Sequence, residues 1–370
     1  MIDLTGSNVL RCLDCGKCTS ACPVARYNKV LSPRRLMGQL GEGRTENIGE
    51  AVWACLTCMQ CDTRCPQQVT ISTSVPKLRE IARAGGEKPP TTRCGIMESI
   101  AAIQSQAAVP QNRLDWLTDD LKTDPESKTM LWVGCAPYFD TFFAENGVNT
   151  LQSVISAIKI LNALDIEPAV LADERCCGHD ALWSGDQETF KRLSELNVKL
   201  FEKLQPELVV TVCPECSMTL IKEYQRLHGV PTGEVKHISE VIVENADRLP
   251  LQASAQTVTF QDPCRLGRHQ QKYDEPRQAL AAVPELELKE MARSRRGAVC
   301  CAGSWLVCNQ ATKRIQTDRL KEAVASGGES LVTACPKCLV HYKCAQTGDE
   351  SVPKIEIRDL ATVVADALNN

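Results

Sequence analysis

The sequence predicts a multidomain protein of mixed α/β and α+β class, in which a small α-helical domain precedes two repeated parallel βαβ modules. Three observations support this prediction: a length of 370 residues, a four-cysteine motif that occurs twice near the N-terminus, and a longer five-cysteine pattern that occurs twice in the remainder. A chain of this length divides into two or three domains. We expect the helical domain at residues 1–100 with a helical connector to about 126, the first module at 127–250 and the second at 251–370.

Composition narrows the functional class. The formal net charge is −4 and no lysine or arginine run is present, so we expect no nucleic-acid partner. We also expect no membrane span and a cytoplasmic location, because neither a signal peptide nor a stretch of about 18 apolar residues is found. In a reducing compartment, the 21 cysteines favour metal or iron-sulfur ligation over disulfides.

The first repeat is the motif Cys-x2-Cys-x2-Cys-x3-Cys-Pro, at residues 12–23 and 55–66. Three cysteines of such a motif converge on one cubane, while the fourth points toward a second cluster. Zinc is the alternative, but it explains neither the third cysteine nor the proline. A ferredoxin-like domain with two [4Fe-4S] cubanes is therefore predicted, and it requires an electron donor or acceptor at its surface. The spacing assigns Cys12, Cys15, Cys18 and Cys65 to one cluster, and Cys55, Cys58, Cys61 and Cys22 to the other.

The remainder of the chain alternates strand-like and helix-like segments, which is typical of parallel βαβ units. In such units the carboxyl ends of the strands lie at one edge of the sheet, so residues that follow the strands gather there. Predicted strands at 130–134, 208–212, 257–261 and 331–334 lead into Cys135, Cys213, Cys264 and Cys335. Apolar periodicity predicts helices at 151–164, 190–204 and 312–325, and a further short strand at 168–171.

Each module supplies five cysteines, one more than a cubane requires. An adjacent Cys-Cys pair must be turned back toward a common centre, and Gly178 permits that turn. In the second copy this role shifts to Ala302 and Gly303. Cys213 and Cys335 stand at helix N-termini, which stabilise thiolate charge. The two sets are Cys135, Cys176, Cys177, Cys213 and Cys216, and Cys264, Cys300, Cys301, Cys335 and Cys338.

At these residues the chain resembles the heterodisulfide reductase family. The five-cysteine pattern is similar to the CCG domains of the B subunit, and the eight-cysteine segment is similar to the C subunit, so the chain resembles a C-plus-B fusion. The resemblance implies a noncubane [4Fe-4S] cluster in each module, bound by all five cysteines, and reduction of a disulfide by one-electron steps at the two clusters. Zinc, or a cubane that uses four of the five cysteines, remains the alternative in each module.

The resemblance also implies partners: a flavoprotein subunit resembling heterodisulfide reductase A, other electron-transfer subunits and an anionic disulfide substrate. No dinucleotide-binding fingerprint is present, so FAD is expected only on a partner chain. The alternative function is an electron relay within a flavoprotein dehydrogenase complex of the hydroxyacid, glycerol-3-phosphate or acyl-CoA type, without disulfide chemistry of its own. A purely structural zinc scaffold is the third interpretation.

Four further residues are candidates for catalysis. Arg265, Arg268 and Arg295 lie near second-module cysteines in sequence and suit the capture of an anionic substrate, although a solvated surface or a partner contact fits them equally well. His179 follows Cys-Cys-Gly and is a candidate proton donor, or a hydrogen-bond donor to a cluster sulfide. The remaining cysteines are expected to be inert: Cys94 in the connector, and Cys308 and Cys344 on predicted helices.

Overall fold

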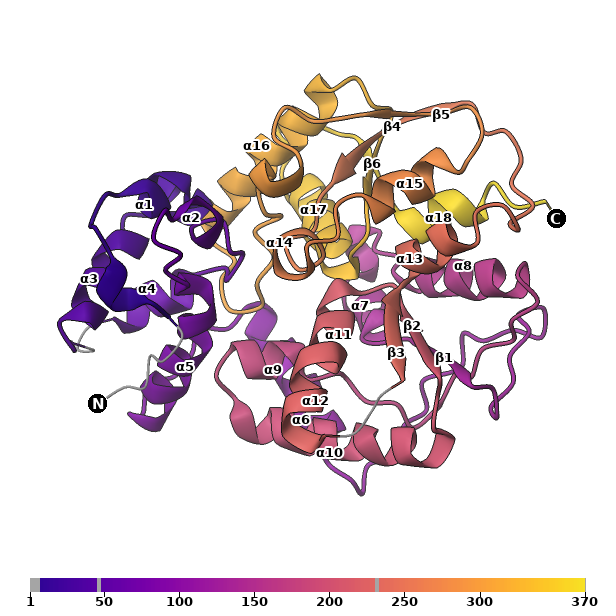
Figure 1. Ribbon diagram of the computed structural model, residues 1–370, viewed down its shortest axis with the longest axis horizontal. Helices are drawn as coiled ribbons and strands as arrows, with labels where there is room; N and C mark the ends of the chain where they lie inside the picture. Colours follow the sequence, from indigo (N-terminus) through magenta and orange to yellow (C-terminus); the bar gives the residue numbers. More distant parts are fainter. Residues whose placement is uncertain (1–6, 45–47, 230–232, 370) are drawn as a thin grey trace.

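The computed structural model describes residues 7–44, 48–229 and 233–369 (Figure 1). Short helices separated by cysteine-bearing turns build the N-terminal domain, and α6 belongs to the connector. Pro23 and Pro33 each occupy the first helical position, where the missing N–H costs nothing. The elements are η1 (Val9–Arg11), α1 (Lys17–Ala21), α2 (Pro23–Tyr27), α3 (Pro33–Gly41), α4 (Gly49–Ala54), η2 (Asp62–Arg64), α5 (Ile71–Ala84), η3 (Arg93–Gly95) and α6 (Ile96–Gln104).

The first module is built on a three-stranded parallel sheet of order β1-β2-β3. Its strands are β1 (Thr129–Trp132), β2 (Leu208–Thr211) and β3 (Glu234–His237). Its helices are α7 (Ala136–Phe142), η4 (Ala144–Asn146), α8 (Leu151–Asn162), α9 (His179–Trp183), α10 (Gln187–Leu204), α11 (Pro214–Thr219), the π-helical turn η5 (Leu220–Tyr224), α12 (Gln225–His228) and α13 (Ile238–Glu244).

The second module has a four-stranded parallel sheet of order β5-β4-β6-β7. Its strands are β4 (Gln256–Gln261), β5 (Leu286–Lys289), β6 (Ser330–Thr333) and β7 (Glu356–Asp359). Its helices are α14 (Gly267–Gln270), α15 (Glu275–Ala281), η6 (Arg295–Gly297), α16 (Gln310–Ala325), α17 (Pro336–Gly348) and α18 (Leu360–Ala365). The predicted class, a helical domain followed by two parallel α/β modules, is confirmed.

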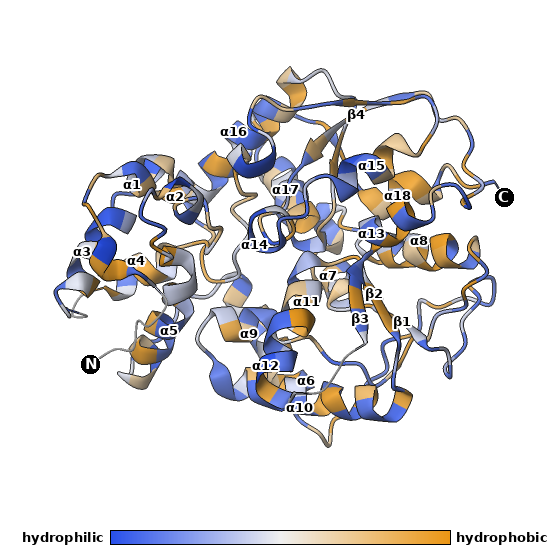
Figure 2. Cartoon of the chain, viewed as in Figure 1, coloured by the Kyte–Doolittle hydropathy of each residue, from blue (hydrophilic) through white to orange (hydrophobic). Residues whose placement is uncertain are grey.

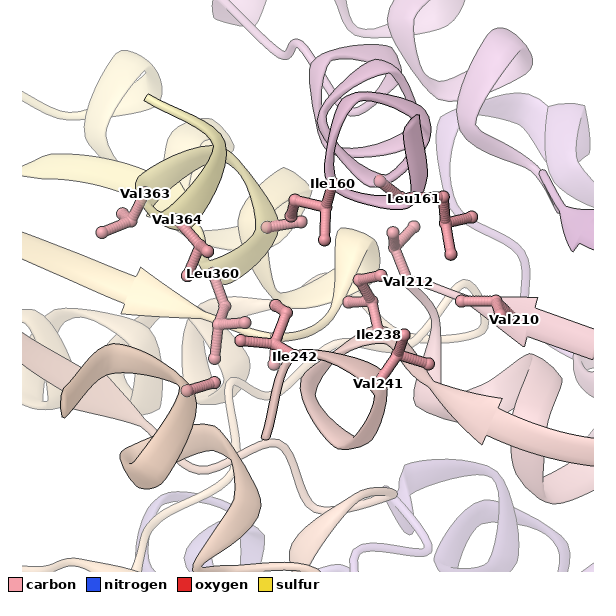
Figure 3. Packing of buried hydrophobic residues seen from close by; sticks show 14 of the residues in the cluster. Ile160, Leu161, Val210, Val212, Ile238, Val241, Ile242, Leu360, Val363 and Val364 are labelled. Carbon is pink, nitrogen blue, oxygen red and sulfur yellow. The ribbon is translucent and has the colours of Figure 1, made fainter. Parts of the chain in front are cut away.

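The two modules share one apolar core (Figure 3). Leu131 of β1 and Val133, which follows that strand, face this core together with side chains of α8, α13, α15 and α18. Figure 3 shows Ile160 and Leu161 of α8 near Ile238 of α13 and Leu360 of α18. In Figure 2, hydrophobic residues accordingly follow β1, β2, α8 and α18. The modules therefore fold onto each other as one body.

The opposite faces of the two sheets have different neighbours. In the first module, Met130 and Trp132 pack with residues of α9, α10 and the turn η5. In the second module, Leu331 lies in a cluster that also contains Leu56 and Cys58 of the N-terminal domain. The N-terminal domain thus shares its apolar packing with the second module.

Two features of the sheets differ from the sequence-based expectations. The predicted strand at 168–171 forms only a single bridge, from Ala169 to Met130. The carboxylate of Glu174 accepts hydrogen bonds from the backbone N–H groups of Val133 and Gly134, so a side chain replaces the next partner along this edge of β1. The strands β3, β5 and β7 were not predicted; each is a four-residue edge strand with charged residues, which is a weak strand signal.

Across the three described segments of the chain, no helix combines the length and apolar character needed to cross a membrane.

Candidate functional site

Four cysteines of the N-terminal domain form an outer group. Cys12, Cys15, Cys18 and Cys65 line one small pocket, and Cys15 is exposed to solvent. Gly16, at φ +78°, turns the chain between Cys15 and Cys18 so that both face this pocket. Cys65 reaches it from the second motif, as the ferredoxin-type spacing predicts. Four thiols around one space are the donor set that an iron-sulfur cluster needs.

An inner group lies deeper in the same domain. Cys22 caps α2, and burial is the main cause that raises its pKa to about 12, with the nearby thiolates of Cys58 and Cys55 adding to the effect. Cys61 has the same two neighbours, and its pKa is raised by burial and by the charge of Asp62. The inner group of Cys22, Cys55, Cys58 and Cys61 therefore also fits a cluster, whose iron would take the thiolates without protons.

The first module brings its five cysteines to one pocket, lined by Cys135, Cys176, Cys177, Cys213 and Cys216. The Sγ atoms of Cys135 and Cys176 are 3.4 Å apart. Cys135 and Cys213 occupy the N-cap positions of α7 and α11, each before a helix with proline in its first turn. Gly178, at φ +82°, turns the chain after the Cys-Cys pair. The carboxyl ends of β1 and β2 thus deliver thiols to one edge, as the sequence predicts.

The second module repeats this arrangement. The Sγ–Sγ distances are 3.9 Å from Cys300 to Cys264 and 3.1 Å from Cys338 to Cys301. Cys335 caps α17 and lies within hydrogen-bonding reach of Cys338. The left-handed turn after the Cys-Cys pair falls on Ala302 itself, at φ +55°, and not on the following glycine. The turn therefore keeps its place in both copies, although only the first has glycine there.

The inner group and the second module meet directly. Cys58 lies within hydrogen-bonding reach of Cys300, and this contact, with the charges of Arg268 and Arg265, lowers the pKa of Cys58 to about 6 against the opposing effect of burial. Cys58 and Cys300 also belong to one apolar cluster. Two sets of potential cluster ligands are therefore in contact across a domain boundary.

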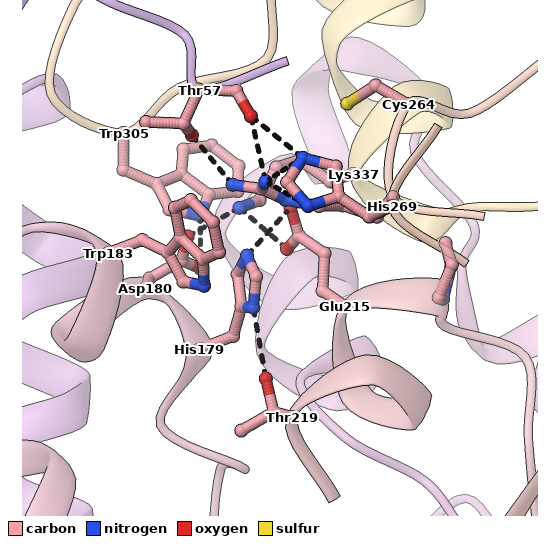
Figure 4. Close-up of polar contacts among 12 residues, drawn as sticks. Thr57, His179, Asp180, Trp183, Glu215, Thr219, Cys264, His269, Trp305 and Lys337 are labelled. Atoms are coloured by element: carbon pink, nitrogen blue, oxygen red, sulfur yellow. Dashed lines mark hydrogen bonds and ion pairs between the residues drawn. The ribbon is translucent and has the colours of Figure 1, made fainter. Parts of the chain in front are cut away.

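A cavity lies where the three parts of the chain converge. Its lining includes Cys55 of the inner group, Cys264 of the second module, and the rings of Trp183 and Trp305. Its charged wall joins the modules: Lys337 of α17 pairs with Asp180 of α9 and, at 2.7 Å, with Glu215 of α11 (Figure 4). Asp180 also accepts a hydrogen bond from the indole of Trp305.

His179 lies between the first module's cysteines and this cavity. Its Nδ1 is 3.0 Å from Thr219 Oγ1, its Nε2 is 3.6 Å from Glu215, and its ring stacks on Trp183 (Figure 4). Burial and the nearby cations Arg265 and Lys337 lower its pKa well below the usual value, so the imidazole is neutral. A catalytic role for His179 stays a prediction.

The three candidate arginines are placed differently from one another. Arg265 lines the cavity, lies over the ring of Trp183, and donates to the carbonyl and hydroxyl of Thr57. Arg268 is 1% exposed and donates to the carbonyl of Cys58. Arg295 is exposed, pairs with Asp274 and does not line the cavity. Their proposed role in substrate capture stays a prediction; Arg265 and Arg268 instead each bind a backbone carbonyl of the N-terminal domain, in addition to partners in their own module.

The cysteines outside the four groups differ from expectation in their exposure and, for Cys308, in position. Cys344 lies on α17 and is partly buried, but Cys94 and Cys308 are exposed, and Cys308 precedes α16 instead of lying on a helix. Cys308 lies before Asn309, whose side chain caps α16 and so fixes where that helix begins.

Sequence analysis identified His179 and Arg265 but not the ion-pairing groups of the cavity wall. Glu215 and Lys337 are the variable residues of the two Cys-Pro-x-Cys motifs, and they carry opposite charges at equivalent positions. That opposition was the available signal, because opposite charges at equivalent positions of two repeats form an ion pair where the repeats meet. Asp180, Trp183 and Arg79, which also line the cavity, carried no comparable signal.

Comparison with known proteins agrees with this organisation. Residues 8–69 match the model of the 4Fe-4S dicluster domain, and residues 130–221 and 258–343 each match the model of the cysteine-rich domain named CCG. A solved structure, described as a hypothetical protein from Helicobacter pylori, aligns with a TM-score of 0.62 over 93% of this chain and 69% of that chain, at 10% identity, which shows likeness of fold.

Curated relatives span nearly the whole chain, and two of them serve as examples. One is a "Probable membrane-anchored ferredoxin" of Chromohalobacter salexigens, 28% identical over 97% of this chain, and the chain spans only 60% of that relative's length. The other is a component of the dihydromethanophenazine:CoB–CoM heterodisulfide reductase of Methanosarcina barkeri, 25% identical over 96% of this chain and 93% of that relative.

Proposed function

The chain is an iron-sulfur protein that joins a 4Fe-4S dicluster domain to two cysteine-rich CCG domains, and from this premise we propose that it is the disulfide-reducing subunit of a heterodisulfide reductase-like complex. Electrons come from a partner flavoprotein, enter through the N-terminal domain and reach the two cysteine-rich modules. When bound, two cubane and two noncubane clusters supply one-electron transfer. The substrate is a disulfide that carries anionic groups.

One observation carries the proposal. His179, Asp180, Glu215 and Lys337 line both the pocket of the first module's cysteines and the central cavity, and Cys264 of the second module lines that cavity as well. A molecule in the cavity would thus contact the surroundings of both cysteine sets at once. Such a position is what a disulfide needs if each of its sulfurs is to be reduced by a different module.

The residues of the wall have definable roles in this function. The paired charges of Lys337, Asp180 and Glu215 hold the modules at a fixed separation across the cavity. Trp183 and Trp305 give the cavity apolar walls that exclude water from the reacting sulfurs. The neutral Nε2 of His179, beside Glu215, is placed to hydrogen-bond a ligand in the cavity.

Iron content tests the cofactor assignment. Protein purified without oxygen should contain about 16 irons per chain, since four clusters hold roughly four each. Cys177→Ala and Cys301→Ala should each remove about four irons, because each deletes a buried ligand of one module. Cys94→Ser is the matched control, since Cys94 is exposed and outside the four groups, and it should keep all the iron. About eight irons in the unaltered chain, or zinc in the modules, would contradict the proposal.

Substrate-dependent EPR tests the reaction. When the reduced protein is oxidised by the CoB–CoM heterodisulfide, a paramagnetic signal should appear that a neutral disulfide of similar size does not produce. Cys177→Ala and Cys301→Ala should each abolish this signal. If the protein keeps all its iron and no disulfide of a thiol coenzyme produces such a signal, the disulfide reductase function is overturned.

A relay function is the second candidate, and a specific observation favours it. Four of the five second-module cysteines are no more than 5% exposed, as expected where electrons only pass through a protein. A relative named as a ferredoxin also agrees with this function. A relay would show all four clusters reducible by a flavoprotein and no disulfide-dependent signal.

A further inference from the structure

Two arginines of the second module cross the domain boundary. Arg265 donates from Nη1 to the carbonyl of Thr57 at 2.9 Å and from Nη2 to its hydroxyl at 2.7 Å. Arg268 donates from Nε to the carbonyl of Cys58 at 2.5 Å and from Nη1 to the carbonyl of Ala298 at 2.7 Å. The loop that carries two ligands of the inner group is therefore held by guanidinium groups of another domain.

Arg268 lies beside thiols of both groups. Its charge acts on Cys58 of the inner group and on Cys264 and Cys300 of the second module. Its Nη2 is buried and has no hydrogen-bond partner within the part of the chain that the structure describes. A buried N–H of a charged group is costly to leave unpaired, and thiolate or sulfide sulfur is the acceptor available at this position once iron is bound.

The first module meets the inner group in a different way. Arg79 of the N-terminal domain donates to the carbonyl of Cys55 at 2.5 Å and to the carbonyl of Trp183 in the first module at 2.6 Å. The one thiol that acts on its charge is Cys55 of the inner group, whereas Arg268 lies beside thiols of two groups.

Counting from the first cysteine of each five-cysteine set, the positions of Arg265 and Arg268 are Ala136 and Phe139 in the first module. Phe139 packs against the rings of Phe143 and Trp305. The two repeats are therefore alike in their cysteines and differ in the residues that face the inner group.

We propose that Arg268 is a positioning residue that couples the inner group of the N-terminal domain to the second module, so that electrons pass between these two and not directly to the first module. The inference rests on the proposed function in that both groups must hold iron-sulfur clusters. One electron leaves the cluster of one group and enters the cluster of the other, and no covalent bond is made or broken.

The charge of Arg268 can assist this transfer because it is fixed and buried. Reduction of either group adds negative charge, which a nearby cation stabilises in a medium of low dielectric constant where salt does not screen it. Net charge and hydrogen bonds to sulfur set the potentials of iron-sulfur clusters. The guanidinium also fixes the Cys58 carbonyl, and with it the separation of the groups.

Three variants of the full chain, purified with iron, test the role of the charge. Arg268→Gln removes the charge, Arg268→Lys keeps the charge but loses the planar donor set, and Arg296→Gln removes a charge from an exposed position of the same module. EPR-monitored redox titration should show that Arg268→Gln disfavours reduction of the inner cluster on the order of tenfold, which lowers its reduction potential by 59 mV for a one-electron couple. Arg268→Lys should lower this potential less, and Arg296→Gln should leave it unchanged.

Magnetic coupling tests the choice of module. In the reduced protein, coupling to the second module should broaden the signal of the inner cluster, and this broadening should disappear in Cys301→Ala but persist in Cys177→Ala. Unchanged potentials in Arg268→Gln with its iron retained, or broadening lost in Cys177→Ala alone, would overturn the inference. If Arg268→Gln loses iron, the reduction potential of the inner cluster is compared between Arg268→Lys and the unaltered chain, and unchanged potentials there would likewise overturn the inference. A shortage of iron in the unaltered chain would instead contradict the proposed function.

Discussion

Single residues beside the cysteines set the shape of the candidate site. The left-handed turn after each Cys-Cys pair occurs at Gly178 in the first module and at Ala302 in the second, although only glycine adopts that conformation without strain. At Gly178, an added Cβ would lie 2.6 Å from the ring of Phe190. The first module therefore depends on glycine for two reasons, conformation and space.

We accordingly expect Gly178→Ala to lower the free energy of unfolding by about 2–4 kcal/mol, from the left-handed strain and the overpacking together. It should also reduce iron binding in the first module, because Cys176 and Cys177 would shift. Urea unfolding and iron analysis measure the two effects. Gly38→Ala is the matched control: Gly38 lies in α3 with free space around it, so alanine should stabilise that helix by about 0.5–1 kcal/mol. Equal effects of the two substitutions would contradict this prediction.

At the scale of elements, several strands lead within a few residues into the N-terminus of a helix. Cysteines occupy this position at α7, α11 and α17, and His237 occupies it at α13, directly after β3. The Nδ1 of His237 accepts the backbone N–H of Ser239, and its Nε2 lies 3.2 Å from the carbonyl of Val212. This arrangement requires the neutral imidazole, and burial lowers the pKa of His237 to about 4 from its ordinary 6.5.

This cap predicts a pH dependence of stability. Because the folded pKa of His237 is below the unfolded one, its contribution is fully present above pH 6.5 and is lost as the pH falls toward 4. The loss should be about 2 kcal/mol between pH 7 and pH 5. Asn caps helices well and does not titrate, so His237→Asn should remove this part of the slope, while the lost contact with the Val212 carbonyl lowers the stability at pH 7. Urea titrations of both proteins at the two pH values measure it; parallel slopes would contradict it.

At the scale of the whole molecule, an ion pair network centred on the buried Lys337 connects the modules. Lys337 is 6% exposed, and it faces two carboxylates of the other module, Asp180 and Glu215. Burial alone would lower the pKa of Lys337, but these two partners raise it well above its usual value. The network and the shared core of α8, α13, α15 and α18 make the two modules one folding unit.

Lys337→Met should therefore destabilise the protein by about 3–5 kcal/mol, because it leaves the largely buried carboxylate of Glu215 without its cation. The double variant Lys337→Met, Glu215→Gln should recover part of this loss, since removing both partners costs less than removing one. Lys321→Met, at an exposed position of α16, is the control and should stay within about 0.5 kcal/mol. Thermal unfolding of the iron-loaded proteins compares the unaltered chain with these three variants. A loss of stability in Lys337→Met no larger than that in Lys321→Met would argue against the network.

The sequence by itself determined the domain order, the strands that lead into cysteines and the four candidate ligand groups, because each depends on spacing within short segments or on repetition. Only the tertiary structure decided which surfaces meet. The partners of Arg265 lie 208 residues away at Thr57, and Lys337 meets Asp180 across 157 residues. Edge strands such as β7 likewise exist only because a neighbouring strand pairs with them. Contacts between distant segments arise from the packing of whole elements, and no local pattern of residues records that packing.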